Sequence, residues 1–127
     1  MLQTIDFIVA QLVGTADSKG VITLVPTDPV PGDQYWRIER ITVTPALAGS
    51  ESVECGVYGG SPGPLTVRDW VDLPAGTIGV AEYPQPITIE STTLLTIQIT
   101  GAQPGDSAVA IVQYAVVQRV NIQTQAA

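Results

Sequence analysis

Ten prolines and twelve glycines divide this chain of 127 residues into short segments, which alternate apolar and polar residues or are rich in β-branched ones. That pattern is typical of short strands separated by turns, and no helical periodicity of useful length interrupts it. About eight strands at this spacing predict an all-β fold, an antiparallel β-sandwich with jelly-roll topology. An immunoglobulin-like arrangement is the alternative. The length is that of a single domain, so we expect residues 1–127 to form one sandwich. The expected strands cover residues 5–13, 21–25, 34–43, 53–58, 65–73, 86–90, 94–100 and 107–118.

The segment QYWRIERITV (residues 34–43) carries its large apolar residues on both parities. Trp36 and Ile38 share one parity, and Ile41 and Val43 share the other. A strict period of two would send these two pairs to opposite faces of a sheet. A β-bulge between the pairs, at the Glu–Arg dipeptide, would bring all four side chains to the core. The residues expected to pack the core are Trp36, Ile38, Ile41, Val43, Val57, Ile97, Ile99 and Tyr114.

The end of the chain raises a question of length. The motif GAQPGD separates the last two expected strands and predicts a hairpin with a longer loop. A straight strand over residues 107–120 would span about 46 Å at about 3.3 Å per residue. A compact domain of this size has a diameter of about 36 Å. Either the strand bends or its end projects. We expect an N-terminal arm (1–9) and a C-terminal arm (119–127), with a frayed tail as the alternative for the second.

The charge balance excludes several partners. Charged residues make up only 13% of the chain, and the net charge is −7. The five basic residues are scattered, and so acidic a chain repels nucleic-acid phosphates and anionic membranes. We therefore expect neither nucleic acid nor membrane as a partner.

The first residues lack the basic region of a signal peptide, and no apolar run reaches the roughly 18 residues of a membrane span. The protein is expected to be made in a cytoplasm.

Residues for catalysis or metal binding are sparse. The chain has no histidine, which removes Ser–His and Cys–His nucleophilic pairs and the commonest transition-metal ligand. The single cysteine, Cys55, cannot form an internal disulfide and lies in an alternating core pattern, so we expect an inert buried thiol. The sequence predicts no catalytic residue, no cofactor and no metal, and the protein is not expected to be an enzyme.

Two acidic groups allow other chemistry. Asp69 and Asp72 flank a tryptophan, as the carboxylates of a glycosidase could. Three residues apart on a strand, however, they would point to opposite faces, and solvated edge charges are the simpler interpretation. Asp17, Asp28 and Asp33 could ligate calcium, but the capping of turns explains them with fewer assumptions.

Aromatic residues offer an alternative function, a surface on which sugars stack. Trp36 and Tyr114 sit where core packing is the simpler explanation. A carbohydrate-binding module on this chain would therefore use Trp70 and Tyr83.

The outer strands suggest assembly. The segments IDFIVAQLV and SAVAIVQYAVVQ are long, apolar and almost uncharged, and we expect them at the sheet edges. Proteins usually protect exposed edges with lysine, proline or a covering element, and the only lysine, Lys19, lies in a turn. A free monomer with such edges risks aggregation, whereas an obligate assembly covers them. The residues expected to contact partner chains are Ile5, Phe7, Val9, Arg119, Val120 and Ile122.

Two stretches carry a resemblance to a known group. In YWRIERITVTPALAGSESVECGVYGG, an aromatic-led strand with a basic residue precedes a strand that ends in VYGG. In AEYPQPITIESTTLLTIQITGAQPGDSAVAIVQY, the run LTIQITGAQPG leads into a long alternating strand. Together they cover about residues 34–118 and resemble small β-sandwich virion proteins of tailed bacteriophages, which include head-decoration proteins and minor tail components. The resemblance implies a non-enzymatic role in holding capsid subunits together or presenting loops.

The expectation from all these observations is a capsid decoration protein on the outer surface of a tailed-phage virion. Its expected partners are further copies of itself, first of all in a trimer, and the major capsid protein or other virion proteins. The alternatives are a minor tail or baseplate component, a carbohydrate-binding module, and a glycosidase built on Asp69 and Asp72.

Overall fold

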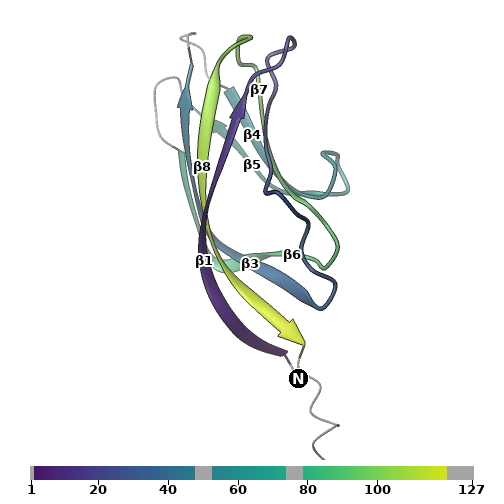
Figure 1. Cartoon of the computed structure of the whole chain (residues 1–127). Coiled ribbons are helices and arrows are strands. Elements are labelled where there is room, and N and C mark those ends of the chain that lie inside the picture. Colours follow the sequence, from purple (N-terminus) through teal and green to yellow (C-terminus); the bar gives the residue numbers. More distant parts are fainter. Residues whose placement is uncertain (1, 48–52, 74–78, 120–127) are drawn as a thin grey trace, which may run out of the picture.

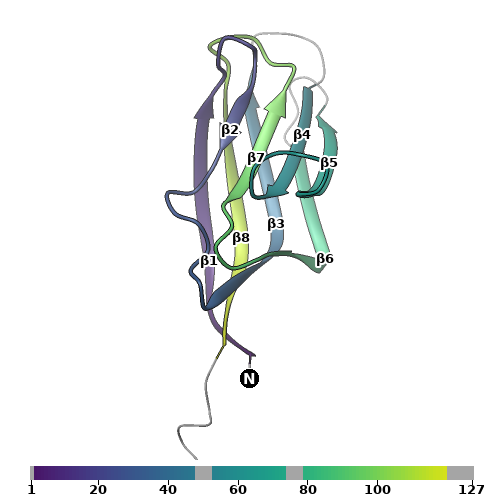
Figure 2. The ribbon, with the colours of Figure 1, turned by 90° about the vertical axis from the view of Figure 1, so that its right-hand side faces the viewer.

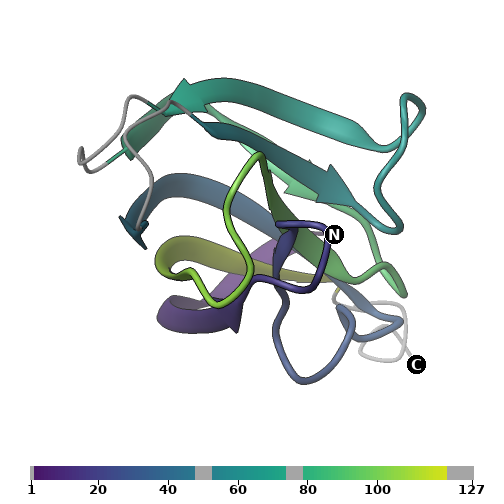
Figure 3. The same cartoon turned by 90° about the horizontal axis from the view of Figure 1, so that it is seen from above.

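The computed structural model describes residues 2–47, 53–73 and 79–119, and these residues form eight strands. Four of the strands make one sheet, in the order β1-β8-β3-β6, and the other four make a second sheet, in the order β2-β7-β4-β5. Figure 2 shows β1, β8, β3 and β6 side by side, and Figure 3 shows the two layers from above. The strands are β1 (Leu2–Thr15), β2 (Ile22–Leu24), β3 (Gln34–Ala46), β4 (Val53–Gly59), β5 (Val67–Leu73), β6 (Gly79–Ile89), β7 (Leu95–Thr100) and β8 (Ser107–Arg119).

The order of the strands is that of a jelly roll. Four antiparallel pairs, β1 with β8, β2 with β7, β3 with β6 and β4 with β5, alternate between the two sheets. A long hairpin with β4 and β5 at its tip produces this order when it rolls up into two layers. The predicted all-β jelly-roll sandwich is therefore confirmed. An immunoglobulin-like sandwich would divide the strands differently between its sheets.

A bulge in β3 lets its large apolar residues reach the core. The register shifts between Ile38 and Arg40 against both neighbouring strands. Because the shift changes the parity, Trp36 and Ile38 on one side of it and Ile41 and Val43 on the other are all buried. The bulge predicted from the sequence is confirmed.

The strand β6 is longer than the expected strand at residues 86–90. It begins at Gly79, and its partners on β3 jump from Ile87 to Glu82, so Pro84 and Pro86 lie in the irregular stretch between. A proline donates no backbone hydrogen bond, but an edge strand tolerates this on its free side and at bulges. The expected strand at residues 86–90 therefore covered only the end of β6.

Two expectations about the last strand are wrong. β7 and β8 do not form a hairpin, because β7 pairs with β2 and β4, whereas β8 pairs with β1 and β3 in the other sheet. The GAQPGD segment therefore crosses between the sheets. β8 is also no edge strand, since β1 and β3 cover both of its sides. Its apolar character reflects a central position rather than a surface that awaits a partner.

The length of β8 is accommodated by bending. β1 and β8 remain paired from Leu2 and Arg119 to Thr15 and Ser107, and both strands curve together along the sandwich (Figure 1). The paired strands bend instead of running straight out of the fold. Residues 120–127, most of the expected C-terminal arm, lie outside the described residues.

The core lies between the two sheets. All eight residues expected to pack it are buried and belong to one cluster. The indole of Trp36 stacks on the phenol of Tyr114, with ring centroids 4.3 Å apart. In the part of the chain that the structure describes, no helix is long and apolar enough to cross a membrane.

Candidate functional site

The free edge of β1 is the least protected edge of the two sheets. β1 pairs with β8 on one side and has no strand on the other among the described residues. It is 14 residues long, contains no proline or basic residue, and carries a single charge, Asp6. The remaining edges have the usual protection: β2 is three residues long, β6 contains two prolines, and β5 carries three charged residues. The β1 edge is therefore the one best suited to pair with another strand.

A strip of apolar side chains lies on the outer face of the sheet beside this edge. Phe7, Val9 and Val13 on β1 are 70%, 67% and 65% exposed. Ile111 on the neighbouring strand β8 is also exposed. Large exposed apolar surfaces often mark contact sites between proteins. We call these four residues, Phe7, Val9, Val13 and Ile111, the β1 strip.

The residues expected to contact partners lie partly within this surface. Phe7 and Val9 belong to the β1 strip, and Ile5 is exposed on the same strand. Residues 2–9, expected as an arm, form the first half of β1 and are paired with β8 in the sheet. Arg119 is the last residue of β8, opposite Leu2. Val120 and Ile122 lie outside the described residues.

A second candidate surface is a hollow on the outer face of the other sheet. Its volume is about 530 Å³, and the loop between β4 and β5, which stands out from the sandwich in Figure 1, forms one side of it. Trp70 is 48% exposed at its rim. We call it the Trp70 hollow, and its main lining residues are Tyr58, Pro62, Pro64, Val67, Trp70 and Gln98.

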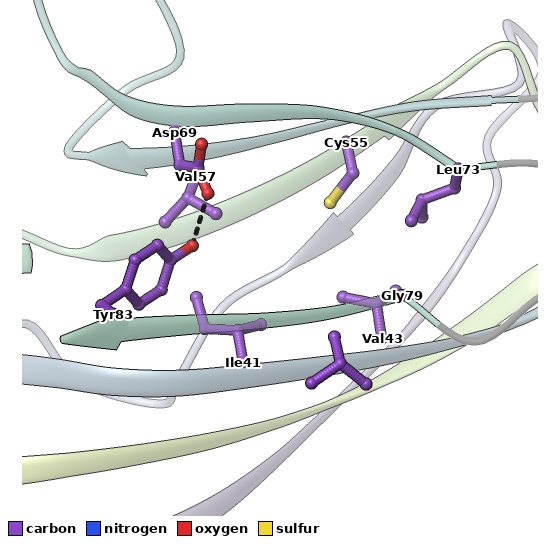
Figure 4. A pocket seen from close by; sticks show the side chains of 9 residues that line it. Ile41, Val43, Cys55, Val57, Asp69, Leu73, Gly79 and Tyr83 are labelled. Atoms are coloured by element: carbon purple, nitrogen blue, oxygen red, sulfur yellow. Dashed lines mark hydrogen bonds between the residues drawn. The ribbon is translucent and has the colours of Figure 1, made fainter.

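The predicted pair of Trp70 and Tyr83 does not form a shared platform. The ring of Tyr83 lies between the two sheets, where its hydroxyl donates a hydrogen bond of 2.6 Å to Oδ2 of Asp69 (Figure 4). Trp70 follows Asp69 on the strand, so its side chain points to the opposite face. The aromatic neighbour of Trp70 in the hollow is Tyr58. The alternation of its strand, with Cys55 and Val57 on the other face, was a signal that could have found it.

The space around Tyr83 and Cys55 is small and internal. The cavity in Figure 4 has a volume of about 40 Å³ and is lined mainly by aliphatic side chains of β3, β4 and β5. Burial, and to a smaller extent the charge of Asp69, raise the pKa of the Cys55 thiol to about 11. Burial also raises the pKa of Tyr83, and its hydrogen bond to Asp69 adds to this. The cavity is close to the volume of one water molecule and offers no room for a substrate.

The acidic residues singled out from the sequence do not come together in the described part of the chain. Asp69 faces the interior, whereas Asp72 is exposed and pairs with Glu54 across the strands, so the two point to opposite faces as expected. Asp17 caps its turn, because its Oδ1 accepts hydrogen bonds from the backbone of Lys19 and Val21, and these bonds lower its pKa. Among the residues described, no cluster of three or more potential ligands could hold a metal ion.

Comparisons with known proteins support the fold. No protein-family model and no curated protein sequence matches this chain. Among solved structures, a protein of Bacillus endospore appendages, which form disulfide-linked pili, is similar with a TM-score of 0.51 and 11% identity, over 93% of this chain and 90% of that one. The virus-like particle of the extra small virus of the prawn Macrobrachium rosenbergii matches with a TM-score of 0.43 and 17% identity, over 87% and 78% of the two chains. A family 32 carbohydrate-binding module of C. perfringens, in complex with galactose, matches with a TM-score of 0.43 and 13% identity, over 83% and 93%. At these identities the likeness concerns the fold, which serves both structural and binding proteins.

Proposed function

We propose that this chain is a non-enzymatic structural protein of a tailed-phage virion, which decorates the outer capsid surface and associates with further copies of itself. The observation that carries the proposal is the β1 edge together with the β1 strip. The edges at β2, β5 and β6 are protected by shortness, charges or prolines, whereas the 14 residues of β1 have a single charge, Asp6, and one register shift beside it. The resemblance of residues 34–118 to phage virion proteins supports the capsid as the place of assembly.

The β1 edge and the β1 strip can act together at one interface. Pairing of β1 with a strand of a second chain would satisfy its free backbone groups and extend the sheet. The same contact would cover Phe7, Val9 and Val13, which are exposed beside the edge. Complete burial of such a side chain contributes about 1.5 to 3 kcal/mol.

These gains in free energy are similar in size to the entropic cost that opposes association. Loss of translational and rotational freedom alone requires about 4 to 15 kcal/mol. Three apolar side chains and one strand pair are therefore sufficient for a weak self-contact but insufficient for a tight one. A surface that also binds a capsid would hold many copies at high local concentration, and this would favour the weak contact. The acidic net charge of −7 suits the outside of a capsid better than its DNA-filled interior.

A comparison of two matched variants tests self-association. Val9→Lys places a charge in the β1 strip, whereas Leu65→Lys places the same charge on a loop residue that is 92% exposed and distant from β1 in the fold. In sedimentation velocity over a range of concentrations, we expect the unchanged protein and Leu65→Lys to form the same oligomer. Val9→Lys should shift to the monomer with an unchanged circular-dichroism spectrum. A parent protein that stays monomeric at high concentration, or a Val9→Lys variant that assembles normally, would contradict the proposal.

The virion assignment has its own test. Purified phage heads and purified tails, each incubated with the protein and then pelleted, should retain it on heads alone. Retention on tails would support the alternative, a minor tail or baseplate component. Retention on neither would refute the virion role and leave only the self-association.

A further inference from the structure

The Trp70 hollow has a floor built from a cross-strand row. Trp70 on β5 and Gln98 on β7 both lie opposite Gly56 of the central strand β4. Gly56 has no side chain, and the phenol of Tyr58 occupies the vacant place: a Cβ on Gly56 would lie 2.5 Å from the Tyr58 hydroxyl oxygen. The row thus presents an exposed indole at one end, a phenol across the middle and an amide at the other end.

Two carboxylates lie in the next row of the same face. Glu54 of β4 is opposite Asp72 of β5, and both are exposed. Asp72 follows Trp70 by two residues, so its Cα lies about 7 Å further along the same side of the strand. The basic residue of β5, Arg68, pairs with Glu90 at 3.4 Å. The surface beside the hollow is therefore rich in hydrogen-bond acceptors and negative charge.

We propose that the Trp70 hollow binds a neutral saccharide. One face of a pyranose ring is apolar and fits the flat, exposed face of an indole, which is the type of contact that Trp70 offers. The ring also carries hydroxyl groups around its edge, which can donate to carboxylates and bind amides. Gln98 supplies an amide within the hollow, and Glu54 and Asp72 supply carboxylates in the adjacent row. A volume of about 530 Å³ lies within the range of small-molecule sites, about 300 to 1,000 Å³, and apolar walls with a few polar groups are typical of such sites.

The charge of the surface narrows the class of ligand. Sialylated, sulfated or phosphorylated sugars would meet Glu54 and Asp72 in a protein of net charge −7, and repulsion would weaken their binding. A proline-rich peptide is the competing occupant, because such peptides also bind aromatic surfaces. They dock into grooves lined with several aromatic side chains, whereas only Trp70 is substantially exposed here, since Tyr58 is 6% exposed. These observations favour the saccharide.

The site is independent of the proposed assembly. The Trp70 hollow lies on the outer face of the β2-β7-β4-β5 sheet, and the β1 strip lies on the outer face of the other sheet. The outer faces of a sandwich look in opposite directions. A copy attached through the β1 strip would therefore leave the hollow open to solvent.

The experiment uses the full chain and defined probes. Neutral hexasaccharides of glucose, xylose, mannose, galactose and N-acetylglucosamine are titrated against the protein by isothermal calorimetry, with sialyllactose, a heparin hexasaccharide and a deca-proline peptide as comparison ligands. We expect at least one neutral hexasaccharide to bind. Trp70→Ala should weaken that binding at least tenfold, and Gln98→Ala should weaken it several-fold. Trp70→Tyr should bind more tightly than Trp70→Ala, because it keeps an aromatic ring.

The controls separate this proposal from the proposed function. Leu65→Ala changes an exposed apolar residue that does not line the hollow and should leave the affinity unchanged. Val9→Lys, the variant designed to be monomeric, should bind the saccharide as the parent does. No binding of any neutral probe at millimolar concentration, equal binding by Trp70→Ala, or preference for the anionic sugars or the peptide would each overturn the inference.

Discussion

The indole of Trp36 stacks on the phenol of Tyr114 across the two central strands of one sheet, with centroids 4.3 Å apart and an angle of 27° between the rings. The rings face the second sheet because the bulge in β3 keeps its apolar residues on the inner side. Both residues are less than one tenth exposed. The stack therefore lies in the core, on the strand whose change of parity predicted the bulge.

The first prediction compares the two tryptophans. Trp36→Ala leaves a cavity in the core and should lower the free energy of unfolding by about 3 to 5 kcal/mol. Trp70→Ala removes a half-exposed side chain and should lower it by less than half as much. Urea denaturation monitored by circular dichroism gives both values. Equal losses would show that Trp36 is not a core residue.

A double-mutant cycle with Tyr114→Ala should assign about 0.5 to 1.5 kcal/mol to the stack itself.

The second prediction concerns the reactivity of Cys55. With its pKa raised to about 11 by burial, the thiol should be about a hundredfold less ionised near pH 8 than one with the ordinary value of 9.0. Because the thiolate is the nucleophile, alkylation by iodoacetamide in the folded protein should be slower by at least that factor than in denaturant. Mass spectrometry of timed samples measures both rates. Rapid labelling of the folded protein would place the thiol at the surface.

The third prediction is a loss of stability at high pH. Burial and the hydrogen bond to Asp69 raise the pKa of Tyr83 above its ordinary value of 10.0. Above pH 10 the unfolded chain loses this proton first, so the folded state binds more protons and its stability falls as the pH rises. Tyr83→Phe removes the proton and should make the decline between about pH 9.5 and 11 shallower. It should also lower stability near pH 7 by about 1.5 to 3 kcal/mol, because a hydrogen bond to a carboxylate is lost. Denaturation series at several pH values test this, and parallel declines for parent and variant would exclude Tyr83 as the cause.

The fourth prediction separates backbone strain from steric clash at two glycines. Gly20 and Gly105 both have positive φ, +76° and +90°. A Cβ on Gly20 would lie 1.9 Å from the carbonyl oxygen of Ala102, whereas one on Gly105 would have no atom within 4 Å. Gly105→Ala should lower stability by about 1 to 2 kcal/mol through its conformation alone. Gly20→Ala should lower it further, because the two connections must move apart. Thermal unfolding of both variants measures the difference, and equal effects would show that the contact with Ala102 yields easily.

Much of the fold could be predicted because strand formation is local. Alternating residues and Gly–Pro turns identified seven strands nearly in place, and the change of parity in QYWRIERITV identified the bulge. The expected strand at residues 86–90 covered only the end of β6, since whether a strand tolerates prolines depends on its position in the sheet. The GAQPGD segment misled us similarly, because a hairpin and a crossing between sheets have the same turn residues.

The residues that form the two candidate surfaces could be predicted only in part from the sequence. Phe7 and Val9 were expected at a partner contact, and they are exposed on the outer face of β1. Trp70 was paired with the wrong aromatic residue, because Tyr83 faces the interior and Tyr58 reaches Trp70 only through the register of β4 and β5. Contacts across strands depend on this register, which is set by the pairing of two strands and cannot be predicted from one segment alone.

The sequence by itself determined that this chain forms strands separated by turns, because alternation and turn chemistry act between neighbouring residues. Only the tertiary structure decided which apolar strand became central and which remained an edge. β1 and β8 have similar composition, and β8 is covered on both sides while β1 is covered on one. The physical reason is that burial of an edge depends on the strand that lies beside it, and in a jelly roll that strand comes from a distant part of the chain.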